Sequence, residues 1–186
     1  LSFIDRRVDG VILALASSTS DVLKRVNDYN VPFVLVDRPL NNVSQYVGVY
    51  ADHQQGFYMS TNYFVNKGYK RIAFLGGPRN VLSTKERFEG YKRALEDAGI
   101  SIDGSLIKFD DFSVAGGERM LNELLSECAK FEAVVAGSDL TAIGAIRELK
   151  LNNIEVPGDC EVMGFDGIRL GEFVDPPIST VAQPIY

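Results

Sequence analysis

The stretch RIAFLGGP, residues 71–78, decides the fold. It is an apolar run of strand length that ends in glycine and proline, which break a strand. Residues 83–86, STKE, resemble a capping box and predict that a helix starts there. The apolar residues that follow recur at helical spacing up to Gly99, and they are Phe88, Tyr91, Ala94, Leu95 and Ala98. A strand followed by an amphipathic helix is the repeating unit of a parallel sheet covered by helices.

The same alternation extends in both directions along the chain. Strands are predicted at residues 11–15, 33–36, 46–50, 106–109, 133–136, 161–165 and 178–181. The run VILAL at 11–15 is apolar throughout, which predicts a strand buried on both faces, and a helix is expected from about residue 19 to 29. The pattern indicates an α/β fold of two lobes: a partial N-terminal lobe at 1–50 and a C-terminal lobe at 51–178.

Composition excludes several classes of protein. The 186 residues carry 19 Lys+Arg and 25 Asp+Glu, a net charge of −6, so the chain is not expected to bind nucleic acid by itself. No apolar run approaches the roughly 18 residues of a membrane span. Two cysteines and one histidine supply neither a disulfide framework nor a typical zinc site. We therefore expect no metal and no cofactor.

Ligands of open parallel sheets bind beyond the carboxyl ends of the strands. Five of the predicted strand ends carry a carboxylate, and an arginine follows a sixth. The polar and aromatic residues at these places are Asp37, Arg38, Asp52, Arg87, Asp110, Asp111, Phe112, Ser138, Asp139 and Asp166. Carboxylates accept hydrogen bonds from hydroxyl groups, arginine donates them, and aromatic faces cover the C–H side of a sugar. The set predicts a site for a polyhydroxylated ligand.

Each of these residues also has a structural interpretation. Ser138 and Asp139 are equally well placed to cap a helix, Arg87 to form a surface ion pair, and Asp166 to make a turn. His53 is interpreted as a solvated residue in a loop or at a helix start. The two cysteines, Cys128 and Cys160, are expected to be buried thiols.

Signals of catalysis are weak. The chain has no G-x-S-x-G elbow and no G-x-x-x-x-G-K-[ST] phosphate loop, and one histidine makes a nucleophilic triad improbable. No catalytic residue is therefore predicted, and the chain is not expected to be an enzyme. A metal-dependent enzyme that uses the strand-end carboxylates is an alternative, which metal analysis would test.

Seven motifs in order resemble the lactose-repressor/galactose-repressor family of bacterial transcription regulators over essentially the whole chain. They are RRVDGVILA, VPFVLVDRPL, GYKRIAFLGGP, RFEGYKRALEDAGI, AGSDLTAIGAIRELK, VPGDCEVMGFDG and DPPISTVAQPIY. The resemblance implies the effector-binding domain, with a periplasmic-binding-protein-like fold of two lobes, each a parallel sheet flanked by helices. Residues 179–186 would be a crossover segment that returns toward the N-terminal lobe. The resemblance also implies that the family's DNA-binding headpiece lies outside this chain.

By this resemblance the effector lies in a cleft between the lobes. The implied ligand contacts are Asp37, Arg38, Arg87, Phe112, Ser138, Asp139 and Asp166. Arg87 and Asp166 match the positions by which the family's ligand sites are most easily recognised. The family commonly has asparagine where this chain has Ser138, so one amide contact is lost.

The resemblance also implies a function. A sugar or sugar derivative would close the lobes of a cytoplasmic homodimer and so control its binding to operator DNA, which would occur only through the headpiece. No membrane partner is expected. The alternative is a sugar-binding component of a transporter with the same fold.

Overall fold

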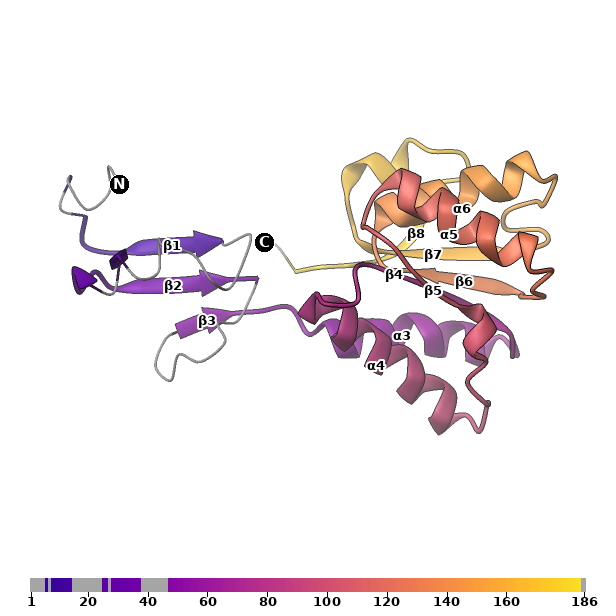
Figure 1. Cartoon of the computed structure of the whole chain (residues 1–186), viewed down its shortest axis with the longest axis horizontal. Coiled ribbons are helices and arrows are strands. Elements are labelled where there is room, and N and C mark those ends of the chain that lie inside the picture. The colour runs from indigo at the N-terminus through magenta and orange to yellow at the C-terminus, as the bar shows by residue number, and fades with distance from the viewer. Residues whose placement is uncertain (1–5, 7, 15–24, 27, 38–46, 185–186) are drawn as a thin grey trace. The chain divides into compact units, whose positions relative to one another are not determined.

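The computed structural model describes residues 6, 8–14, 25–26, 28–37 and 47–184 (Figure 1). The chain divides into two compact units, Leu1–Ala51 and Asp52–Tyr186. Among the described residues no helix is long and apolar enough to cross a bilayer.

The first unit contains a three-stranded parallel sheet in the order β1-β2-β3. Its strands are β1 (Val11–Ala14), β2 (Phe33–Val36) and β3 (Val47–Val49), which confirms three predicted strands. The prediction that β1 is buried on both faces is wrong, because Ile12 is 78% exposed and no described residue covers that side. Leu35 on the central strand is fully buried. The helix predicted between about 19 and 29 lies largely outside the described residues.

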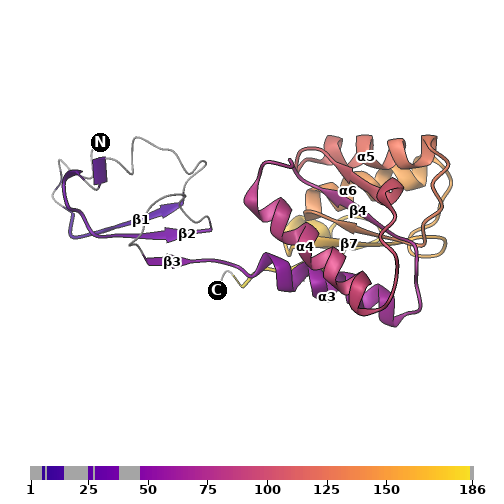
Figure 2. The ribbon, with the colours of Figure 1, turned by 60° about the horizontal axis from the view of Figure 1, so that its bottom comes forward.

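The second unit is built on a five-stranded parallel sheet in the order β5-β4-β6-β7-β8. The strands are β4 (Ile72–Gly76), β5 (Ile107–Phe109), β6 (Ala133–Ala136), β7 (Glu161–Asp166) and β8 (Ser179–Ala182). The helices are α3 (His53–Asn66), α4 (Leu82–Asp97), α5 (Val114–Ser126) and α6 (Asp139–Leu151), with short 3-10 turns η1 (Gly104–Leu106) and η2 (Arg169–Glu172). Figures 1 and 2 show α3 and α4 on one face of this sheet and α5 and α6 on the other.

The two faces of β4 explain why its sequence is apolar throughout. Ile72 and Phe74 pack with α3 and α4, whereas Ala73 and Leu75 pack with α5 and α6. Every residue of this strand is buried. A fully buried side chain of this kind stabilises the fold by about 1.5–3 kcal/mol, so a central strand that is covered on both sides needs no polar alternation.

The structure confirms one predicted helix start, at Ser138, and contradicts another, at residues 83–86. Ser138 caps α6, because its Oγ accepts a hydrogen bond from the Thr141 amide at 3.1 Å. The capping box predicted at residues 83–86 is wrong: α4 begins at Leu82, and Val81 at its N-cap makes no side-chain hydrogen bond. The STKE motif therefore lies inside the first turns of the helix rather than before it.

Close packing of α3 against α4 brings the start of α3 near the middle of α4. A Cβ added to Gly90 on α4 would lie only 2.1 Å from the backbone oxygen of Gln54 on α3. Glycine is thus required for this approach. Since Arg87 lies one helical turn before Gly90, the same approach brings His53, the first residue of α3, within reach of the arginine.

Candidate functional site

The carboxyl edge of the five-stranded sheet gathers five of the seven predicted ligand contacts. Asp166 ends β7, Ser138 and Asp139 follow β6, and Phe112 follows β5. Arg87 lies in the second turn of α4, the helix that follows β4. We call His53, Arg87, Phe112, Phe165, Asp166 and Gln183 the Arg87 cluster, because each of the others contacts the arginine or its carboxylate partner.

Arg87 is a buried cation held by several acceptors. One guanidinium nitrogen, Nη1, donates to the Gly137 carbonyl. The other, Nη2, lies 3.6 Å from Asp166 Oδ1 and 3.3 Å from His53 Nδ1. Its side chain is 7% exposed, whereas that of Asp166 is 29% exposed, so the carboxylate of this ion pair is the member that solvent reaches more readily. The surface ion pair considered from sequence is thus replaced by a buried one.

Two aromatic rings flank the guanidinium. Its central carbon lies 4.3 Å from the centroid of Phe165 and 5.2 Å from that of Phe112. Phe112 is itself placed by glycine, since a Cβ added to Gly77 would lie 2.1 Å from its ring. A cation over aromatic faces is stabilised electrostatically, more so where water is excluded. Gly77, directly after β4, therefore leaves room for an aromatic ring beside Arg87.

Asp166 joins the end of β7 to the residue that follows β8. Gln183 Nε2 donates to Asp166 Oδ1 at 2.7 Å, and the Gln183 amide donates to the Asp166 carbonyl at 3.1 Å. The φ of Asp166 is +119°, in the region that disfavours side chains. Such strain persists where the surroundings hold it and is common at functional sites.

Ser138 and Asp139 have structural roles in this arrangement. Ser138 caps α6, as described above. Asp139 is completely buried, and its carboxylate accepts from the Ile168 amide at 2.7 Å and from the Thr180 hydroxyl at 2.6 Å. Asp139 thus fixes the loop after β7 and holds β8 in place. Contact of either residue with a ligand stays a prediction.

The two remaining predicted contacts belong to the first unit. Asp37 follows β2, is exposed, and has a φ of +77°, while its amide donates to the Val49 carbonyl at 3.1 Å. Arg38 lies outside the described residues. The structure therefore brings Arg87, Phe112 and Asp166 together, and the meeting of Asp37 and Arg38 with them stays a prediction.

Three members of the Arg87 cluster were missed from the sequence. His53 is a helix-start residue as predicted, but it is only 4% exposed, so the prediction that it is solvated is wrong. For Phe165 the sequence pattern predicts only a place in a strand and no functional contact. Gln183 lies just beyond the carboxyl end of β8, so extending the strand-end rule to that last strand would have found it.

Other carboxylates at this edge are engaged elsewhere. Arg119 on α5 donates to both oxygens of Asp110, at 2.7 and 2.8 Å. These hydrogen bonds lower the pKa of Asp110, against the effect of its partial burial. Asp111 Oδ1 accepts from Ser113, the N-cap of α5. No group of three or more possible metal ligands occurs in the described part of the chain.

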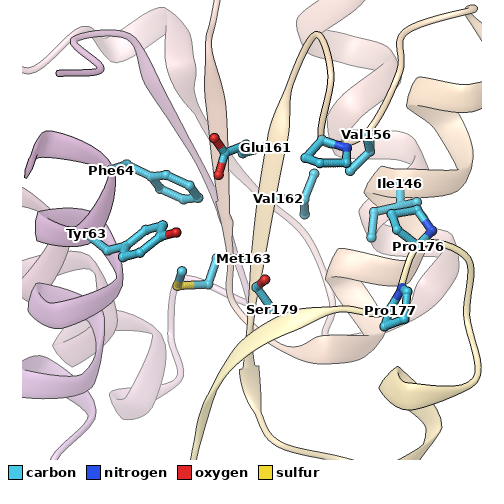
Figure 3. A pocket seen from close by; sticks show the side chains of 11 residues that line it. Tyr63, Phe64, Ile146, Val156, Glu161, Val162, Met163, Pro176, Pro177 and Ser179 are labelled. Carbon is cyan, nitrogen blue, oxygen red and sulfur yellow. The ribbon is translucent and has the colours of Figure 1, made fainter. Parts of the chain in front are cut away.

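A cavity lies at the starts of β7 and β8, the ends of these strands opposite to the Arg87 cluster (Figure 3). Its volume is about 90 Å³, and α3, α6 and the starts of β7 and β8 contribute to its wall. Glu161 is its one acidic residue, and it accepts hydrogen bonds from Lys67 and Tyr69. Burial alone would raise the pKa of Glu161, but these hydrogen bonds outweigh that effect and lower it.

Comparison with known proteins identifies the family. The model of the periplasmic binding proteins and sugar-binding domain of the LacI family matches residues 2–185. The chain belongs to the LacI family. It is 38% identical over 184 residues to the HTH-type transcriptional regulator RegA of Clostridium saccharobutylicum, covering 98% of this chain and 55% of RegA. It is 33% identical over 180 residues to the regulator CelR of Thermobifida fusca, covering 96% of this chain and 53% of CelR.

Solved structures agree with this assignment. A complex of the transcriptional regulator CelR with cellobiose superimposes with a TM-score of 0.86 at 33% identity, covering 96% of this chain and 55% of that one. The chain thus has the periplasmic-binding-protein-like fold of LacI-family effector domains, and it spans about half the length of the curated relatives it matches. These relatives are regulators of transcription rather than enzymes.

Proposed function

We propose that this LacI-family chain is the effector-sensing domain of a bacterial transcription regulator and that its effector is a sugar or sugar derivative. The observation that carries the proposal is the Arg87–Asp166 pair at the carboxyl edge of the five-stranded sheet. A guanidinium and a carboxylate side by side offer donors and an acceptor to neighbouring hydroxyl groups. The related regulator CelR was solved in complex with cellobiose, a sugar rich in hydroxyl groups, which supports a ligand of the same class for the present chain.

The second unit would supply Arg87, Phe112 and Asp166 as direct contacts. Phe112 would cover the apolar face of the sugar ring, while the ion pair binds its hydroxyl edge. Ser138 and Asp139 would form the floor of the site, and Asp37 and Arg38 would contact the ligand from the first unit. A ligand that touches both units favours a closed arrangement over an open one, which is how binding would be converted into a change of angle.

The regulator would work as a homodimer in the cytoplasm and bind operator DNA through a separate headpiece. Exposed apolar side chains support self-association: Leu151 at the end of α6, Leu170 in η2 and Phe173 just after it are 66%, 52% and 72% exposed. A dimer interface would remove such side chains from water, which favours association. We expect the chain to sediment as a dimer and Phe173→Glu to convert it to a monomer, whereas Tyr63→Glu, a similarly exposed aromatic on α3, leaves the dimer intact.

Titration calorimetry of the 186-residue chain against glucose, xylose, ribose, cellobiose and their phosphates tests the sugar site. For a sugar that binds, Arg87→Ala and Asp166→Ala each cost about 2–5 kcal/mol of binding free energy, because each leaves a buried or engaged charge without its partner. Arg147→Ala is the matched control, since Arg147 is 65% exposed and pairs with Glu118. Unchanged affinity in Arg87→Ala would rule out this site.

A further inference from the structure

The Arg87–Asp166 pair is contacted by side chains from both ends of the second unit. His53 is the first residue of α3, one position after the unit begins at Asp52. Gln183 is the first residue after β8, the last strand of the sheet. His53 contacts the arginine and Gln183 contacts the carboxylate. The two polar partners thus come from the segment that enters the unit and the segment that leaves its last strand.

We propose that His53 and Gln183 are positioning residues that couple the effector-binding pair to these two segments. The inference rests on the proposed function, in which the pair binds the effector. It assigns a role to two side chains that are not among the predicted ligand contacts and that instead contact Arg87 and Asp166. A ligand that pulls on Arg87 or Asp166 would act on both segments through them.

The hydrogen bond at the arginine specifies the state of the imidazole. Arg87 is a permanent cation with no acceptor, so its Nη2 must donate to His53 Nδ1, which lies 3.3 Å away. That nitrogen can accept only if the ring is neutral and carries its proton on Nε2. His53 is only 4% exposed, and the centroid of its ring lies 5.8 Å from that of Phe165, so packing holds the orientation of the ring.

The hydrogen bonds at the carboxylate fix the position of the residue after β8 relative to the end of β7. Oδ1 of Asp166 accepts from Gln183 Nε2 at 2.7 Å and lies 3.6 Å from Arg87 Nη2, so one oxygen links the glutamine to the arginine. Gln183 is also bonded to Asp166 through the backbone, and Ala182 pairs with Asp166 in the sheet. The side-chain link therefore extends a backbone link, and a shift of one residue would be transmitted to the other.

Nuclear magnetic resonance of the single histidine tests the geometry without any ligand. His53 is the only histidine of the chain, so long-range ¹H–¹⁵N spectra contain one imidazole. At neutral pH we expect the Nε2–H tautomer, and we expect Gln183→Leu to shift the ring signals through Asp166 and Arg87. Asn122→Leu, at an exposed position of α5, should leave them in place. An Nδ1–H tautomer, or signals that ignore Gln183→Leu, would overturn the proposal.

Affinity and scattering test the coupling, with the free sugars named above as probes. For a sugar that binds, His53→Leu and Gln183→Leu each weaken binding roughly tenfold, since each removes a hydrogen bond to a charged group. His53→Gln restores much of the loss, because its amide oxygen can accept from Arg87, and Gln54→Leu on the exposed side of the same turn is neutral. At saturating sugar, we expect small-angle scattering to show that the wild type contracts and that the double variant, with His53→Leu and Gln183→Leu together, does not.

The outcomes separate this inference from the proposed function. If Arg87→Ala abolishes sugar binding while both leucine variants bind and contract like wild type, the coupling is wrong and the site stands. If the wild type binds none of the sugars, the proposed function fails, and the histidine spectra still decide whether the two side chains position the pair.

Discussion

The hydroxyl of Thr180 donates to Oδ1 of the fully buried Asp139 at 2.6 Å and so ties β8 to the start of α6. The other carboxylate oxygen accepts from the Ile168 amide at 2.7 Å. A buried carboxylate is stable only while such donors surround it. This pair of hydrogen bonds therefore holds the last strand and the loop that carries Asp166 against the helix.

Removing the hydroxyl should be costly at this position. We expect Thr180→Val to lower the free energy of unfolding by about 1–3 kcal/mol, because the variant keeps the shape but leaves Asp139 short of a donor. Urea denaturation measures the difference. Thr61→Val is the matched control, since the buried Thr61 hydroxyl has no hydrogen-bond partner among the described residues. An equal loss in both variants would contradict the role given to Asp139.

The contact of α3 with α4 should not tolerate a methyl group. Alanine favours a helix over glycine by about 1 kcal/mol, but at Gly90 its Cβ would meet the Gln54 backbone oxygen at 2.1 Å. We expect Gly90→Ala to destabilise the protein by about 1–3 kcal/mol net, as overpacking does. Thermal unfolding checks this, with Gly104→Ala as control because nothing lies within 4 Å of a Cβ there. A more stable Gly90→Ala variant would show that the helices can separate without cost.

Strands could be predicted from the sequence because each is a short apolar run between strong breakers. Parallel pairing followed from the helices between them, since a parallel connection requires a crossover. The start of α4 could not be predicted, because Val81 has no side chain that caps. The burial of β1 was predicted wrongly for a different reason. An apolar run shows which side chains a strand could bury, but it does not show whether other parts of the chain cover them, and Ile12 is exposed.

At the site, the strand-end rule found Arg87, Phe112 and Asp166 because the topology alone brings strand ends together. It could not distinguish carboxylates that meet a ligand from those that brace the protein. Asp139 and Asp110 look alike in sequence, yet one is buried under β8 and the other pairs with Arg119. Local sequence carries no record of such distant partners, and the burial of His53 depends on helix packing in the same way.

Acid should weaken the stabilisation that comes from the hydrogen bonds of Glu161. Its pKa is lowered in the folded protein, because the hydrogen bonds from Lys67 and Tyr69 outweigh its burial. The unfolded state thus binds the proton more readily: the stabilisation is fully present above the unfolded pKa of about 4.3 and is lost as pH falls through the folded value. Lys67 is 40% exposed, so solvent screens the interaction and we expect an effect below about 1 kcal/mol.

Glu161→Gln tests this linkage. The variant should be less stable than wild type at neutral pH and should approach it in acid, when urea unfolding is followed from pH about 7 to about 3. Asn122→Leu, an uncharged substitution at an exposed position of α5, should shift stability by the same amount at both ends of that range. A difference between Glu161→Gln and wild type that grows toward low pH would reverse the assigned direction.

The two thiols should differ sharply in reactivity. Both were expected to be buried, but only Cys160 is, whereas Cys128 is exposed just after α5, so that prediction is wrong for Cys128. Burial raises the pKa of the Cys160 thiol to about 12, which leaves almost no thiolate at neutral pH. We expect Ellman's reagent to modify one thiol rapidly in the native protein and both in urea. Cys128→Ser should abolish the rapid phase and Cys160→Ser should preserve it; a rapid phase that survives Cys128→Ser would mean that the sheet opens around Cys160 in the native state.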